Sequence, residues 1–171
     1  MNIIPAYTPK LSGVLTSAVI PALEAAYTAA TDQKHIKAVI TLNSNGPFMQ
    51  CYPAEVLRGI RYFCDTHGLH FISDEAYANT VFGAKATPFT SALALIKGEE
   101  NGSSRVEQST IDPSLVHVIW SATKDFGSTG IRSVSINTIF SGFFHPGLIV
   151  NTLQILIKSL QAVSYAVPSL G

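Results

Sequence analysis

The sequence predicts an α/β fold in which a mostly parallel β-sheet is flanked by helices. Three short runs rich in β-branched and apolar residues have the composition of buried strands; they span residues 37–42, 69–73 and 116–120. The first run lacks polar alternation, which is typical of a strand covered on both faces. A helix pattern with short connections separates the first two runs. This strand–helix–strand order predicts parallel neighbours joined by a right-handed crossover.

The predicted helices are bounded by proline and glycine. Residues 21–31 are rich in alanine and begin with a proline at a suitable first helical position, so we expect a helix there. Pro53 opens a second helix, and Gly68 closes it in the position after the C-cap. Residues 132–138 form a candidate fourth strand, whereas the polar segment 97–113 has the composition of a surface loop.

Composition and charge exclude several classes of function. The 171 residues suit one domain, and a formal net charge of zero without a Lys/Arg cluster argues against nucleic-acid and membrane-surface partners. Polar residues and a proline interrupt the uncharged stretch 133–157, which disfavours a transmembrane span. Cys51, Cys64 and the histidines match no metal-binding spacing. We therefore expect no metal site, reduced thiols and a cytoplasmic protein.

Polar side chains follow each of the three predicted strands. Asn43 and Asn45 come after the first strand, Asp74 ends the second, and residues 121–124 follow the third. The carboxyl ends of parallel strands meet at one edge of a sheet, and ligands of open α/β sheets bind beyond that edge. The sequence therefore predicts a binding site there.

The segment after the third strand carries two hydroxyls, a lysine and an arginine: Ser121, Thr123, Lys124 and Arg132. Hydroxyls and a guanidinium suit a phosphate group, because the guanidinium fork matches phosphate geometry. A partly desolvated lysine beside them could form a Schiff base with an aldehyde cofactor. The alternative is an ordinary solvated loop with polar residues.

Asp74 and Tyr77 add a second candidate group. A carboxylate at the end of a buried strand can pair with a pyridinium nitrogen and make the ring an electron sink. Tyr77, three residues later, could hydrogen-bond a phenolic oxygen on the same ring. The alternative is that Asp74 caps a helix and Tyr77 packs nearby. Glu75, between them, is expected to be structural or to face solvent.

Several motifs together resemble a known family. They are S-D-E-x-Y at 73–77 and S-x-T-K-D-F-G at 121–127, with supporting matches at 50–53, 63–68 and 80–82. In order and spacing they resemble the class I/II aminotransferases, which are fold-type I pyridoxal-phosphate enzymes. The likeness is greatest to the 1-aminocyclopropane-1-carboxylate synthase-like branch.

The resemblance implies the central part of the large domain of the aminotransferase fold. The whole chain, 1–171, would be a single partial domain that binds pyridoxal 5′-phosphate. Its motifs lie in 38–132, and a strand plus a helix follow in 133–171.

The resemblance also implies a role for each matching residue. Lys124 is similar to the lysine that holds the cofactor and moves a proton between substrate and cofactor carbons. Asp74 resembles the partner of the pyridine nitrogen and Tyr77 the hydroxyl donor to the ring oxygen, so these three are the implied catalytic residues. The implied phosphate ligands are Ser121, Thr123 and Arg132.

One loop departs from the family pattern. The usual N-P-x-N-P-x-G sequence is replaced here by N-S-N-G-P-F-M at 43–49. In one register Gly46 stands where an asparagine would touch the ring oxygen. A shift by one residue would let Asn45 serve instead, and whether Asn43 or Asn45 takes this role is left open.

The implied function is that of a pyridoxal-phosphate-dependent aminotransferase, or of a 1-aminocyclopropane-1-carboxylate synthase-like lyase, acting on an amino acid. Compared with the family the chain is expected to be truncated at both ends and incomplete alone, with a homodimer partner or a complementing chain. We also expect Arg58 and Arg61 to face solvent, which leaves no arginine for a substrate carboxylate. The alternative is an inactive truncated homologue with a scaffold or dimer-interface role.

Overall fold

The computed structural model describes residues 3–45, 50–81, 86–95, 112–127 and 134–138. The helices and strands in these residues belong to one compact unit, Ile4–Ser141. Residues 97–111 of the predicted loop 97–113 lie outside the described residues, as do the predicted helix after residue 138, Gly46 and Arg132.

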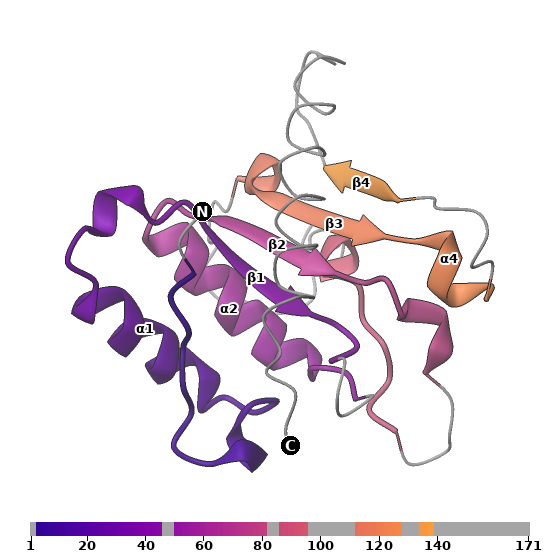
Figure 1. Cartoon of the computed structure of the whole chain (residues 1–171), viewed down its shortest axis with the longest axis horizontal. Coiled ribbons are helices and arrows are strands. Elements are labelled where there is room, and N and C mark those ends of the chain that lie inside the picture. Colours follow the sequence, from indigo (N-terminus) through magenta and orange to yellow (C-terminus); the bar gives the residue numbers. More distant parts are fainter. Residues whose placement is uncertain (1–2, 46–49, 82–85, 96–111, 128–133, 139–171) are drawn as a thin grey trace, which may run out of the picture. The chain divides into compact units, whose positions relative to one another are not determined.

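The described strands form one sheet in the order β1-β2-β3-β4 (Figure 1). β1 pairs with β2 and β2 with β3 in parallel, whereas β4 runs antiparallel to β3. The predicted α/β fold with a mostly parallel sheet is therefore confirmed, and β4 lies within the candidate fourth strand. The strands are β1 (Ala38–Leu42), β2 (His70–Asp74), β3 (Val116–Trp120) and β4 (Ser135–Thr138).

Two longer helices accompany the sheet, α1 (Val19–Ala29) and α2 (Ala54–Thr66). α2 packs on one face of the sheet and α1 packs against α2 (Figure 1). α1 begins two residues before the predicted Pro21, which still falls in the first helical turn, where backbone N–H groups need no helical partner. The shorter helices are η1 (Leu11–Gly13), η2 (Gln33–His35), η3 (Ala78–Thr80), η4 (Pro113–Leu115) and α4 (Ala122–Asp125).

The core lies between α2 and one face of the sheet. Alternate strand residues such as Phe71 and Val118 are buried against the apolar stripe of α2. On the other face of β1, Ile40 is 48% exposed and Leu42 is 45% exposed. The expectation that this strand is covered on both faces is thus wrong for β1 in the described structure.

The end of α2 follows the predicted glycine signal. His67 is the C-cap, and Gly68 adopts the left-handed conformation with φ of 63°. The N–H of Leu69 donates to the carbonyl of Cys64, and the N–H of Gly68 donates to that of Asp65. These two bonds form a Schellman motif, which satisfies the last carbonyls of the helix and turns the chain into β2.

Arg61 corrects one expectation. Arg58 is exposed as predicted, but the Arg61 side chain is only 3% exposed. The helical period explains the error, because position 61 is four residues after Leu57 and three before Cys64, both buried in the stripe. The long aliphatic stem of arginine can lie along such an apolar surface.

Both cysteines are free and buried, in agreement with the expectation of reduced thiols. Burial is the main reason that the pKa of Cys64 rises to about 12, with the nearby Asp65 carboxylate adding to the effect. Within the described part of the chain, no helix is long and apolar enough to cross a membrane.

We expect Gly68→Ala to lower the free energy of unfolding by about 1 kcal/mol, because a Cβ disfavours the left-handed conformation. No heavy atom lies within 4 Å of a Cβ built at this position, so the loss comes from the backbone and not from a clash. Urea unfolding measures the change. Gly68→Asn is the matched control and should lose less, since asparagine tolerates positive φ. Equal losses for both variants would argue against this explanation.

Candidate functional site

The ends of β1, β2 and β3 are joined by backbone hydrogen bonds at one edge of the sheet. The N–H of Asn43 donates to the carbonyl of Asp74 over 2.8 Å, and the N–H of Glu75 donates to that of Ile119 over 2.7 Å. Asp74 stands in register between Leu42 on β1 and Ile119 on β3. The segments that follow the three strands therefore begin at the same edge of the sheet, as the sequence predicts.

The surroundings of Asp74 are compatible with both roles considered for it, the capping of a turn and the pairing with a pyridinium nitrogen. Its Oδ1 accepts a hydrogen bond from the N–H of Ala76 over 3.1 Å, so the carboxylate caps the turn that follows β2. Burial raises the pKa of this carboxyl, and the Ala76 hydrogen bond offsets the rise in part. A partly desolvated carboxylate gains from a positively charged partner, which is what a protonated pyridine nitrogen would supply.

Lys124 and Tyr77 come together from different strand ends. Tyr77 precedes η3 after β2, and Lys124 lies in α4 after β3 (Figure 1). The Lys124 Nζ atom is 5.7 Å from the centroid of the Tyr77 ring, within the range of a cation–π interaction. Lys124 is exposed and Tyr77 is half-buried. The amine of Lys124 and the phenol ring of Tyr77 are therefore neighbours at this edge of the sheet.

The two asparagines of the loop after β1 have different surroundings. Asn43 is fully buried; its Nδ2 donates to the carbonyl of Thr90 and its Oδ1 accepts from the N–H of Tyr52. Asn45 pairs through its backbone with Gln50, and its side chain hydrogen-bonds Tyr52. The Asn45 Oδ1 atom is buried without a partner among the described residues. Asn45 therefore retains more capacity for a ligand than Asn43.

The three predicted phosphate ligands are placed only in part. Ser121 is the buried N-cap residue of α4, and Thr123 lies half-buried one residue before Lys124. Arg132 lies outside the described residues. The two described hydroxyl-bearing residues thus lie in the same short segment as the lysine.

Two carboxylates matter more than the sequence suggested. Glu75 is buried, its Oε1 accepts from the N–H of Ala92 over 2.8 Å, and burial raises its pKa. It is therefore structural, one of the two roles expected for it. Asp125 accepts hydrogen bonds from Asn79 and from the Trp120 indole. Only its position in the S-x-T-K-D-F-G motif singled it out.

The described histidines take part in local contacts. The His67 Nε2 atom lies 3.2 Å from a Glu24 carboxylate oxygen. His70 and His117 are hydrogen-bonded at 2.8 Å, at the end of the sheet away from Lys124. In the described ranges, no group of three or more His, Cys, Asp or Glu side chains is arranged to hold a metal ion.

Comparisons with known proteins identify the family of the chain. The family profile of aminotransferase class I and II matches residues 16–138. A probable aminotransferase of Aspergillus oryzae is 37% identical over 131 residues, which cover 74% of this chain and 28% of that protein. 1-Aminocyclopropane-1-carboxylate synthase 1 of Oryza sativa subsp. indica is 31% identical over 170 residues, or 93% of this chain and 33% of that protein.

A solved structure shows the same fold. A double mutant of aspartate aminotransferase from Thermus thermophilus aligns with a TM-score of 0.52 at 19% identity, over 70% of this chain and 25% of that chain. The chain thus spans a third or less of the length of each of these relatives.

We expect Asp74→Asn to stabilise the protein at neutral pH. The folded state raises the pKa of Asp74 above its unfolded value, so the ionised carboxylate costs stability once the pH exceeds the folded pKa. Below the ordinary pKa of an aspartate the group is protonated in both states, and the difference between the two proteins should disappear. Asparagine keeps an oxygen for the Ala76 N–H. Urea unfolding at acidic and neutral pH measures the difference.

Asp112→Asn is a control of opposite sign. Hydrogen bonds from the Ser114 side chain and backbone lower the pKa of the exposed Asp112, so its charged form favours folding. Asp112→Asn should therefore lower stability at neutral pH. Equal stability of the wild type and Asp74→Asn at neutral pH would argue against desolvation of Asp74.

Proposed function

Because the chain belongs to the class I and II aminotransferase family, we propose that the carboxyl edge of its sheet binds pyridoxal 5′-phosphate and that Lys124 holds it covalently. Pyridoxal phosphate is the cofactor of this family. The observation that carries the proposal is the approach of the Lys124 amine to the Tyr77 ring, beside the strand end that carries Asp74.

The donor set at this edge fits the cofactor. Pyridoxal phosphate needs an amine for its aldehyde, an anion for its ring nitrogen, a donor for its ring oxygen and polar ligands for its phosphate. The described residues supply the first three as Lys124, Asp74 and Tyr77. The buried Oδ1 of Asn45, in the loop after β1, has no described partner and is an unused hydrogen-bond acceptor.

Each residue then has a stated task. The Lys124 Nζ atom binds the cofactor and later carries a proton to and from the substrate. The Asp74 carboxylate stabilises the proton on the ring nitrogen, and the Tyr77 hydroxyl donates to the ring oxygen. The proposed phosphate ligands are Ser121, Thr123 and Arg132. When bound, the protonated pyridine ring supplies an electron sink for a carbanion at the substrate α-carbon.

The proposed substrate is an amino acid, and the proposed reaction is amino-group transfer or a lyase reaction of the 1-aminocyclopropane-1-carboxylate synthase type. Relatives with both names match this chain. The cytoplasmic location, the homodimer and the single-domain boundaries stay predictions. An inactive homologue with a scaffold role is the second candidate, and the experiments below separate it from the first.

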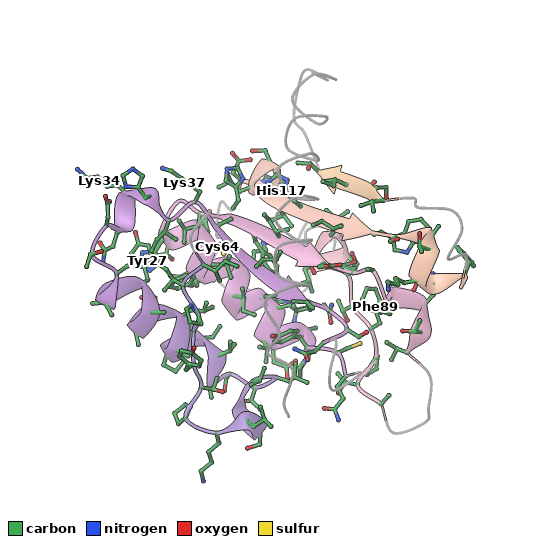
Figure 2. All side chains as sticks on the ribbon, viewed as in Figure 1. Tyr27, Lys34, Lys37, Cys64, Phe89 and His117 are labelled. Atoms are coloured by element: carbon green, nitrogen blue, oxygen red, sulfur yellow. The ribbon has the colours of Figure 1, made fainter. Side chains whose placement is uncertain are left out.

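Covalent capture of the cofactor tests the role of Lys124. The purified 171-residue chain, mixed with pyridoxal phosphate, should develop the yellow absorbance of the bound cofactor, and Lys124→Ala should abolish it. Lys34→Ala is the matched control: Lys34 is exposed and lies where the strands begin, at the other end of the sheet (Figure 2). Borohydride reduction followed by peptide mass spectrometry should place the label on Lys124. Equal absorbance from the wild type and Lys124→Ala would contradict the proposal.

Turnover should be poor even if the cofactor is captured. The two arginines in the described part of the chain are both on α2, Arg58 exposed and Arg61 buried beneath the helix. Neither is placed to hold a substrate carboxylate beside Lys124. Positioning of a substrate can contribute about 7–11 kcal/mol to the lowering of a barrier. We therefore expect transamination and elimination assays with a panel of amino acids to show capture without efficient catalysis.

Rapid turnover that is lost in Lys124→Ala would contradict the expectation of poor turnover. It would mean that another group of this chain binds the substrate carboxylate. No turnover and no capture would favour the inactive homologue.

A further inference from the structure

We propose that Asp125 is a positioning residue that holds the Lys124 turn against the Tyr77 turn, a role that rests on the proposed function of Lys124. Asp125 accepts three hydrogen bonds from two separate segments. Its Oδ1 accepts from the backbone N–H of Asn79 over 3.1 Å, and its Oδ2 accepts from the Asn79 side-chain amide over 3.0 Å. The indole N–H of Trp120 also donates to Oδ2.

These bonds join the two turns that carry the candidate site. Asn79 is the central residue of η3 and lies two residues after Tyr77, whereas Asp125 directly follows Lys124 in α4. Asn79 and Asp125 are 46 residues apart in the sequence. Trp120 is the last residue of β3, so the same carboxylate also holds α4 to the strand from which it emerges. One side chain thus connects the turn that carries the lysine to the turn that carries the tyrosine.

α4 is too short to hold its own position, so contacts outside the helix matter for its placement. The helix has four residues, Ala122–Asp125, and a helix of one turn gains little stability from its own hydrogen bonds. Lys124 is exposed, and the side-chain contact described for it is the one with the Tyr77 ring. Gly127 ends the segment in the left-handed conformation with φ of 61°. The Trp120–Phe126 ring contact and the Asp125 carboxylate therefore both contribute to the placement of the lysine, and Asp125 is the group that connects it to the Tyr77 turn.

A carboxylate suits this task better than the amide of the same shape. All three hydrogen bonds point into its two oxygens, and an ionised acceptor makes each of them stronger. Asp125→Asn keeps the size of the side chain but replaces one acceptor with an NH2 group. At least one donor, from Asn79 or Trp120, must then face another donor. The substitution loosens the connection without opening a cavity.

The test combines one cofactor-dependent readout with two that need no cofactor. Trp120 is the only tryptophan of the chain, so its fluorescence emission reports the indole N–H bond directly. Hydrogen exchange of the Asn79 amide reports the bond to Oδ1. Stopped-flow absorbance reports the rate at which added pyridoxal phosphate is captured. All three use the full chain under conditions in which urea unfolding shows each variant to be folded.

Asp125→Asn should change the Trp120 emission, speed exchange of the Asn79 amide and slow cofactor capture by roughly tenfold to a hundredfold, because small displacements of a reacting group have effects of this size. Asn79→Ala, which removes only the side-chain donor, should slow capture less. Asp112→Asn makes the same carboxylate-to-amide change at the N-cap of η4 and should leave emission and capture unchanged. Lys124→Ala should abolish capture and leave the emission unchanged.

The outcomes separate this inference from the proposed function. Unchanged capture in Asp125→Asn, with altered emission and exchange, would overturn the positioning role and leave the role of Lys124 intact. Absence of capture in the wild type would overturn the proposed function and the positioning role with it, even if the emission still responded. A change in none of the three readouts would show that the Asp125 hydrogen bonds do not hold the two turns together.

Discussion

Parallel pairing of β2 with β3 is the constraint on which the candidate site depends. It places Asp74 opposite Ile119, and the N–H of Glu75 extends the pairing by one further hydrogen bond to the Ile119 carbonyl. The two strands point the same way and end at the same level. The segments that follow them, η3 and α4, consequently begin side by side, although they are distant in sequence (Figure 1). An antiparallel pairing would send Tyr77 and Lys124 to opposite edges.

The adjacent acids at the end of β2 have different surroundings. Asp74 and Glu75 point to different sides, and burial raises the pKa of both carboxyl groups. The hydrogen bond from the Ala92 N–H offsets part of the rise in the pKa of Glu75. The same bond connects the end of β2 to the segment that contains Ala92. The Asp74 Oδ1 atom accepts a hydrogen bond from the Ala76 N–H, and its Oδ2 atom is the second oxygen of the carboxylate. A carboxyl whose pKa is raised by burial, at a strand end that meets other polar segments, is a candidate for a functional position.

Local signals in the sequence predicted most of the fold. The apolar runs identified β1, β2 and β3, because strand periodicity and β-branched composition act within a few residues. Gly68 marked the end of α2, since few residues other than glycine adopt positive φ without cost. The errors came from non-local causes. Arg61 is buried because the helix packs on the sheet, and the exposed face of β1 depends on which segments cover it in the folded chain.

The same division applies to the candidate site. The sequence by itself determined the chemical groups, because the amine of Lys124, the carboxylate of Asp74 and the phenol of Tyr77 each belong to a recognisable local motif. Only the tertiary structure decided that Asn43 is used up by internal hydrogen bonds and that Asp125 joins two distant turns. A hydrogen bond between residues 46 positions apart depends on strand order and register. These follow from the packing of the whole sheet, which no short stretch of sequence specifies.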